Sequence, residues 1–108
     1  MIGSIEKAYI TMRGTLSDPR EAANWMFKYI VRKFGSGTSL DVEQTTEVVT
    51  AFAKRYECDY YTAEKIIAGL AYYPDVTRIY NFGFYRNFGQ YNIYMEKKKI
   101  VRRGGTVM

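Results

Sequence analysis

VTRIYNFGFYRNFGQYNIYM, residues 76–95, is the stretch that decides the fold. Two runs of aromatic and β-branched residues flank Asn87-Phe88-Gly89, where glycine can take the left-handed conformation of a hairpin loop. Pairing Tyr85 with Gln90 would place six apolar side chains on one face: Tyr80, Phe82, Phe84, Tyr91, Ile93 and Met95. The other face would then hold more polar residues: Ile79, Asn81, Gly83, Tyr85, Asn92, Tyr94 and Glu96. The pattern therefore predicts a half-buried antiparallel pair.

A basic arm is predicted after the hairpin, over residues 97–108, with Lys97, Lys98, Lys99, Arg102 and Arg103 as its cations. The net charge of the chain is +5. Residues 76–108 hold seven Lys and Arg against one Glu, whereas residues 1–75 hold nine basic and ten acidic residues. The excess positive charge belongs to the hairpin and arm. It indicates contact with phosphates or with an acidic protein surface, and a solvated tail accounts for it equally well.

Length and composition favour one small domain. The 108 residues suffice for a single core, so we expect residues 1–108 to form one unit. Cys58 is the one cysteine, which excludes a disulfide framework and a thiolate metal cluster. The start of the chain is unlike a signal peptide, and we see no run of transmembrane length. We therefore expect a cytoplasmic protein with no membrane partner, no metal and no cofactor.

Three helices are predicted before the hairpin. The first runs from Pro19 to about Phe34, capped by Ser17 or Asp18. The second covers residues 40–57, and the third covers 60–73 with Asp59 as its cap. Pro74-Asp75 should end the third helix and lead into the hairpin.

Residues 6–13 are ambiguous. Ala8, Ile10 and Met12 alternate with polar positions as in a strand, although Ala8 and Met12 also fit helical spacing. We favour a short strand, because Tyr, Ile and Thr suit a pleated surface. Such a strand could pair with the hairpin to make three strands.

These elements predict an α+β fold in which three helices pack on a small antiparallel sheet with a long C-terminal β-hairpin. The order of elements over Pro19–Met95 resembles the winged helix-turn-helix family of DNA-binding domains. The resemblance implies that the third helix enters the major groove, with Thr62, Lys65 and Tyr72 facing DNA. It also implies that the wing tip contacts the DNA backbone or minor groove through Arg86, Asn87, Phe88 and Gln90.

Enzymatic chemistry finds little support in the sequence. The chain has no histidine, which removes the commonest general acid/base and metal ligand. Without a histidine partner Cys58 is a poor candidate nucleophile. We therefore expect a binding protein and not an enzyme.

Two binding functions fit these features. In the first, the protein binds nucleic acid, DNA in preference to RNA, through Lys65, Tyr72, Arg86, Asn87, Phe88, Lys97, Lys98, Lys99, Arg102 and Arg103. In the second, it is a small inhibitor or adaptor that docks its aromatic and basic hairpin on an acidic groove of a larger nucleic-acid-processing protein. Nucleic-acid binding is favoured because the order of elements points that way.

Overall fold

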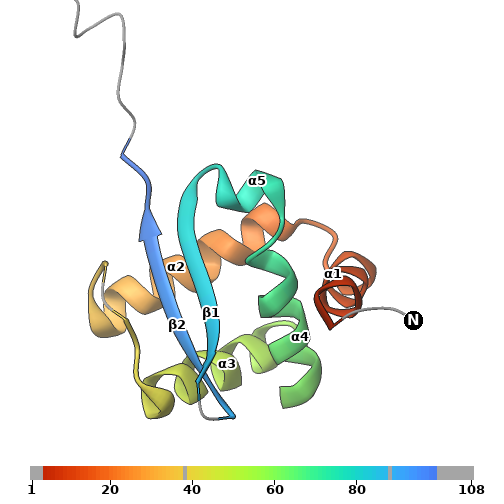
Figure 1. Cartoon of the computed structure of the whole chain (residues 1–108), viewed down its shortest axis with the longest axis horizontal. Coiled ribbons are helices and arrows are strands. Elements are labelled where there is room, and N and C mark those ends of the chain that lie inside the picture. Colours follow the sequence, from red (N-terminus) through yellow and green to blue (C-terminus); the bar gives the residue numbers. More distant parts are fainter. Residues whose placement is uncertain (1–3, 38, 88, 100–108) are drawn as a thin grey trace, which may run out of the picture.

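Helices and a β-hairpin make up the computed structural model, which describes residues 4–37, 39–87 and 89–99. Their order is α1 (Ser4–Thr15), α2 (Pro19–Phe34), α3 (Val42–Arg55), α4 (Tyr60–Leu70), α5 (Pro74–Thr77), β1 (Tyr80–Asn87) and β2 (Gln90–Lys97). The hairpin crosses in front of α2 and α3, and α1 lies on the far side of α4 from it (Figure 1). The predicted α+β class is confirmed. No helix in the described ranges combines the length and apolarity needed to cross a membrane.

The prediction of a strand over residues 6–13 is wrong, because these residues belong to α1. Ala8 and Met12, four residues apart, are buried on one face of this helix. They lie against Gly69 of α4, whose missing side chain lets the two helices approach closely. Packing against α4 therefore overrides the strand preference of Tyr, Ile and Thr.

The three predicted helices are present as α2, α3 and α4, and each begins at an aspartate cap. Asp18 accepts a hydrogen bond from the backbone N–H of Glu21, and Asp59 accepts one from that of Thr62. Asp41 forms a reciprocal capping box with Gln44. The count of three helices is too low, because α1 and the short α5 are also present.

The third predicted helix ends earlier than expected. It stops at Leu70, so Tyr72 lies in the turn before α5. Pro74 does not lead directly into the hairpin. It opens α5 instead, because proline lacks a backbone N–H that the first turn of a helix leaves unpaired anyway.

The hairpin is confirmed, but its predicted register is wrong by two residues. Asn87 pairs with Gln90 and Tyr85 pairs with Asn92, so two residues connect the strands where four were expected. Gly89 adopts a φ of 77°, the left-handed conformation that a tight hairpin connection requires. A shift of two residues keeps every side chain on its face. The predicted inner face is therefore retained, with Tyr80, Ile93 and Met95 buried.

The strand β2 is held to the start of α3 by backbone and side-chain hydrogen bonds. Leu40 N–H donates to the Ile93 carbonyl at 2.8 Å, and Ile93 N–H donates to Thr45 Oγ1 at 3.1 Å. The Asn92 side-chain amide donates to the Leu40 carbonyl at 3.0 Å. Ser39 forms an isolated bridge with Tyr94. The sheet of the described residues has two strands, so the expected third strand from residues 6–13 is replaced by this single bridge.

The core lies between the inner face of the hairpin and the helices. Its largest fully buried side chains come from α1, α2, α3, α4 and β2 and from the connection between α2 and α3: Met12, Met26, Ile30, Leu40, Val48, Val49, Phe52, Ile66, Ile67, Leu70, Ile93 and Met95.

The predicted basic arm begins later than expected. The hydrogen bonds between β1 and β2 continue past the last strand residue, since Lys98 N–H donates to the Ile79 carbonyl at 2.8 Å. Lys97 itself belongs to β2 and not to a separate arm. Residues 100–108 lie outside the described part of the chain.

Replacing Thr45 by valine should destabilise the fold. Thr45 is 2% exposed, and valine keeps its shape while removing the acceptor for Ile93 N–H. A buried N–H without a partner lowers the free energy of unfolding by about 1–3 kcal/mol. Urea unfolding of Thr45→Val measures this change. The control is Thr46→Val, whose exposed hydroxyl bonds to the Val42 carbonyl and whose effect should stay within about 0.5 kcal/mol. Equal effects of the two substitutions would contradict the role assigned to Thr45.

Replacing Gly69 by alanine should push α1 away from α4. The added Cβ would lie 2.6 Å from the Ala8 carbonyl oxygen and 2.7 Å from Met12 Cβ. Such overpacking should lower the free energy of unfolding by about 1–3 kcal/mol in a urea titration. Gly14→Ala on α1 is the matched control, because nothing lies within 4 Å of its Cβ. Alanine is the better helix former, so this control should gain up to about 1 kcal/mol. A loss at both positions would show that the close approach is not the cause.

Candidate functional site

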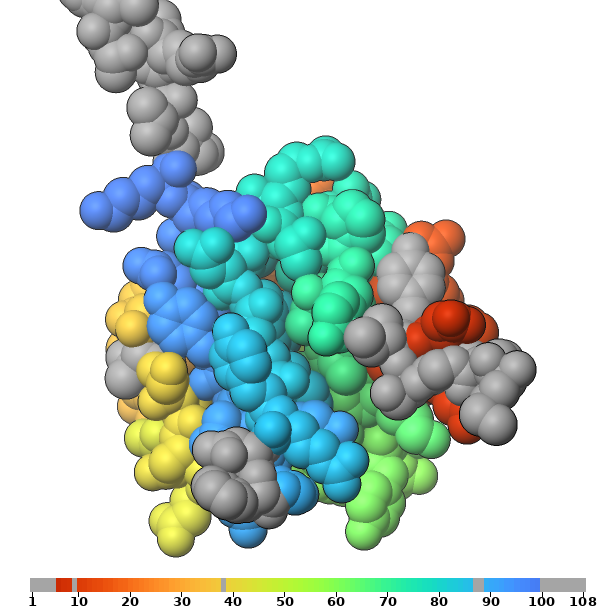
Figure 2. Space-filling model, viewed as in Figure 1, coloured from red at the N-terminus to blue at the C-terminus, as the bar shows by residue number. Residues whose placement is uncertain are grey.

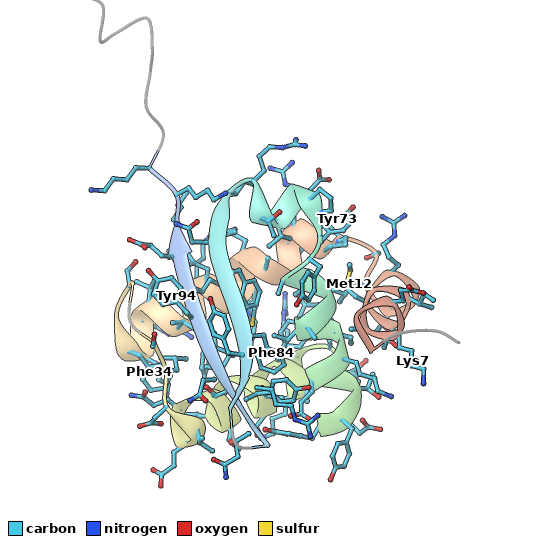
Figure 3. All side chains as sticks on the ribbon, viewed as in Figure 1. Lys7, Met12, Phe34, Tyr73, Phe84 and Tyr94 are labelled. Atoms are coloured by element: carbon cyan, nitrogen blue, oxygen red, sulfur yellow. The ribbon has the colours of Figure 1, made fainter. Side chains whose placement is uncertain are left out.

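A groove of about 580 Å³ lies between α4, the first half of α1 and the tip of the hairpin. Its lining from α4 and the turn that follows comprises Tyr61, Glu64, Lys65, Ala68 and Tyr72. Lys7 and Ala8 of α1 form one wall, and Phe84, Tyr85, Arg86 and Tyr91 of the hairpin form the other. In Figure 3, Lys7 and Phe84 lie on opposite sides of α4. Figure 2 shows the same face, with α4 in green between α1 in red and β1 in cyan.

The floor of the groove follows from helical periodicity. Tyr61, Lys65 and Ala68 recur at intervals of four and three residues, which places them on one face of α4, and Tyr72 of the following turn also lines the groove. The opposite face carries Ala63, Ile66, Ile67 and Leu70, all fully buried. Burial of that apolar face fixes the rotation of α4. As a result, Tyr61 and Tyr72 are turned outward and remain 75% and 56% exposed.

Ring contacts order the hairpin wall. Phe84 and Tyr91 stack with centroids 4.2 Å apart and an interplanar angle of 6°. The Arg86 guanidinium lies 5.8 Å from the centroid of Tyr91, within reach of a cation–π interaction. The ring of Tyr85 lies over Gly83, where an added Cβ would come within 2.2 Å of it. Tyr85 is 60% exposed, so its other face is open to solvent.

The wall formed by α1 depends on its contact with α4. Gly69 allows the backbones to meet at Ala8, and Arg13 Nη1 donates to the Tyr73 hydroxyl at 3.2 Å. Figure 3 shows Met12 between α1 and the rest of the fold. This contact brings Lys7 to the groove. Sequence reasoning missed Lys7 because residues 6–13 were predicted to be a strand, although the spacing of Ala8 and Met12 carried the correct signal.

The charge of the groove is positive. Lys7, Lys65 and Arg86 are exposed and come from three different elements, whereas Glu64 is the one acidic residue of the lining. Burial raises the pKa of the Glu64 carboxyl, and the positive charge of Arg86 partly offsets this rise. Removal of Glu64 from water is thus the larger effect on its pKa. Net positive charge with exposed aromatic rings suits an anionic ligand that has flat groups.

The structure brings together three of the residues predicted for the site and separates others from them. Lys65, Tyr72 and Arg86 share the groove. Thr62, also expected to face a ligand, is half-buried and does not line the groove. The backbone of Asn87 ends β1, but its side chain lies outside the description, as do Phe88, Arg102 and Arg103. Tyr61, Tyr85 and Tyr91 line the groove although sequence reasoning did not select them.

Lys97, Lys98 and Lys99 lie at the other end of the hairpin. Lys97 pairs with Tyr80 at the open end, whereas Arg86 pairs with Tyr91 near the connection. Lys97 is six positions after Tyr91 along β2, a span of about 20 Å. Lys97 lines a different hollow of about 520 Å³, where Asp18, Glu21 and Asp75 also lie. The cations of the hairpin therefore do not form one patch.

Within residues 4–37, 39–87 and 89–99, no group of three or more His, Cys, Asp or Glu side chains is arranged to hold a metal ion. Cys58 is half-buried, and burial raises the pKa of its thiol. A raised pKa keeps the thiol protonated and weakens it as a nucleophile.

Comparison with known proteins gives no relative. The sequence matches no protein-family model, no curated protein and no solved structure. The case for a function therefore depends on the geometry and charge of this chain alone.

Neutralising Arg86 should raise the pKa of Glu64 further. Arg86 lowers that pKa against the effect of burial, so Arg86→Gln leaves burial unopposed. The folded state then holds the Glu64 proton to higher pH than the unfolded chain does. Stability should accordingly fall more as pH rises through the pKa of the folded state. NMR titration of the Glu64 side chain measures the shift.

Arg86→Lys is the matched control, because it keeps the positive charge while removing the guanidinium. Its Glu64 pKa should stay close to that of the wild type. An unchanged pKa in Arg86→Gln would show that the two side chains do not interact in solution.

Proposed function

We propose that the protein binds nucleic acid through the groove between α4, α1 and the hairpin tip. The observation that carries this proposal is the convergence of Lys7, Lys65 and Arg86 around exposed tyrosine rings. Three elements far apart in the chain supply these cations. Phosphate contacts give nucleic-acid affinity, and rings at the same surface give a second, base-directed contact.

The geometry of the cations supports a polyanionic ligand over a single small anion. Lys7 and Arg86 stand on opposite walls, and Lys65 lies on the floor. No described salt bridge joins any of the three to a carboxylate. Arg86 acts at longer range on Glu64 and Lys65 on Asp59, but the groove keeps a net positive charge that a polyanion can neutralise. A chain of phosphates lying along the groove would meet all three, whereas a single phosphate would meet only one wall.

The order of elements supports the nucleic-acid class as well. From α2 to β2 the order is similar to that of the winged helix-turn-helix family, with α4 in the place of its recognition helix and the short α5 as an addition before the hairpin. Between α2 and α3, Ser39 forms an isolated antiparallel bridge with Tyr94 at the edge of the two-stranded sheet. Three helices of the fold, α2, α3 and α4, correspond to those expected from the sequence. In this proposal α1 is an addition that builds one wall of the groove.

A second candidate is docking on an acidic surface of a larger protein. Tyrosine and arginine are enriched among the residues that dominate protein–protein binding energies, and Tyr61, Tyr72, Tyr85 and Arg86 gather here. The two functions differ in what the isolated protein binds. Nucleic-acid binding requires affinity for bare DNA or RNA, whereas docking requires one stoichiometric protein partner.

Removing a groove cation should weaken nucleic-acid binding and reduce its salt dependence. The logarithm of the association constant falls linearly with the logarithm of the salt concentration, because each phosphate contact releases counterions. We expect this slope to become less steep by about 1 in each of the variants Lys7→Ala, Lys65→Ala and Arg86→Ala. Fluorescence anisotropy with labelled single-stranded and duplex probes at several salt concentrations measures the slope.

Lys28→Ala is the control, since Lys28 is exposed on α2 and does not line the groove. Its salt slope should match that of the wild type. A Lys98→Ala, Lys99→Ala double variant tests the far end of the hairpin, which a ligand that also fills the groove reaches only by spanning about 20 Å. If no probe binds while one protein co-purifies at a fixed ratio, the docking function holds in place of nucleic-acid binding.

A further inference from the structure

We infer that the nucleic acid bound in this groove is single-stranded, with its bases stacked on Tyr61 and Tyr72. This inference rests on the proposed function and names its ligand. Two independent features lead to it. One is the way α1 flanks α4, and the other is the exposure of the two rings.

The first feature excludes insertion of α4 as a lone helix into a duplex. The major groove of B-DNA is about 12 Å wide and accepts one α-helix of about 10–12 Å diameter. Beside α4 lies α1, in backbone contact at Gly69 and Ala8. The outward residues of α4 form the floor of a hollow whose walls are α1 and the hairpin. A floor between two walls cannot enter the groove of a duplex, but it can receive a strand.

The second feature is a set of rings that the fold does not use. Tyr61 and Tyr72 are 75% and 56% exposed, and both line the groove. They are two of the five large hydrophobic side chains that are exposed in the described ranges. Burial cannot account for their presence, because more than half of each remains in water. Stacking on bases would use these faces without regard to sequence, since every base has a π-face.

The spacing of the rings fits a short strand. Tyr61 lies in the first turn of α4 and Tyr72 lies in the turn that follows the helix. From Tyr61 to the last helical residue, Leu70, the helix rises about 14 Å. Stacked bases repeat about every 3.4 Å along a strand, so this length corresponds to roughly four nucleotides. Lys65 lies between the two rings in sequence, and Arg86 stands on the wall beside Glu64 and Lys65. The backbone of the strand therefore has cations within the length that the rings define.

Tyr85 is exposed but does not belong to this set of rings. Its ring rests on Gly83 on the outer face of the hairpin, which Tyr94 also shares. Phe84, Arg86 and Tyr91 point to the other face of the hairpin, so Tyr85 is a matched exposed tyrosine outside the predicted stack.

The test compares single-stranded DNA, single-stranded RNA and duplex DNA of equal length, about 20 nucleotides, by fluorescence anisotropy at fixed salt. We expect both single strands, or one of them, to bind at least about tenfold more tightly than the duplex. Preference for RNA over DNA would add contact with the 2′-hydroxyl and would support the inference equally. Equal or tighter binding of the duplex would overturn it.

Substitutions then test stacking itself. Tyr61→Ala and Tyr72→Ala should each weaken single-strand binding by about tenfold, whereas the Tyr→Phe variants keep the ring and should retain most of the affinity. Tyr85→Ala removes an exposed ring on the outer face of the hairpin and should change the affinity little. Val31→Ala is the control, because Val31 is exposed on α2 outside the groove. Because the tyrosines are exposed, urea unfolding should show that each variant remains folded. Loss of affinity in the Phe variants equal to that in the Ala variants would contradict stacking.

The outcomes separate this inference from the proposed function. Binding of duplex alone, weakened by Lys65→Ala and Arg86→Ala but unchanged by the tyrosine variants, would leave nucleic-acid binding standing and overturn the single-strand inference. Failure of all three probes to bind would overturn both.

Discussion

The attachment of β2 to the beginning of α3 is the constraint on which the rest of this structure depends. Ile93 donates its N–H to Thr45 and accepts from Leu40, so both backbone groups of one fully buried residue are paired outside the hairpin. A two-stranded hairpin is at best marginally stable in water. Here the hydrogen bonds to α3, together with burial of Ile93 and Met95, fix the hairpin on the helices. One edge of the sheet is covered by the same contacts.

A hairpin fixed in this way determines where its tip lies. The tip stands beside the outward face of α4, and Gly69 draws α1 to the other side of that helix. The groove therefore results from two separate packing contacts, neither of which involves the residues that line it with charge. This separation lets the lining carry exposed tyrosines and cations at little risk to folding, because the core of Phe52, Ile66, Ile67 and Leu70 lies on the opposite side of α4.

The positive charge of the chain is divided between the two ends of the hairpin. Arg86 belongs with Lys7 and Lys65 near the tip, while Lys97 lies at the open end near Asp18, Glu21 and Asp75. Three carboxylates accompany Lys97 and Arg20 in the hollow at the open end, whereas Glu64 is the one carboxylate among the three cations that line the groove. Net charge counted along the sequence assigned the excess positive charge to the hairpin as a whole. In the structure, the lining of the groove near the tip is net positive and that of the hollow at the open end is not.

Local sequence determined the class of α2, α3, α4 and the two strands of the hairpin, but not the short α5. Pro19, the aspartate caps and the alternating apolar residues of the hairpin act within a few residues, so their effects can be read from the chain. The inner face of the hairpin was predictable for the same reason, although its register required the backbone conformation of the connection at Gly89. Residues 6–13 and the groove were decided by tertiary structure, because the helix over Ala8 and Met12 is selected by contact with Gly69, 61 residues from Ala8. Lys7, Tyr61 and Tyr85 gain their place in the site from that contact and from the attachment of β2, and no short-range pattern encodes either.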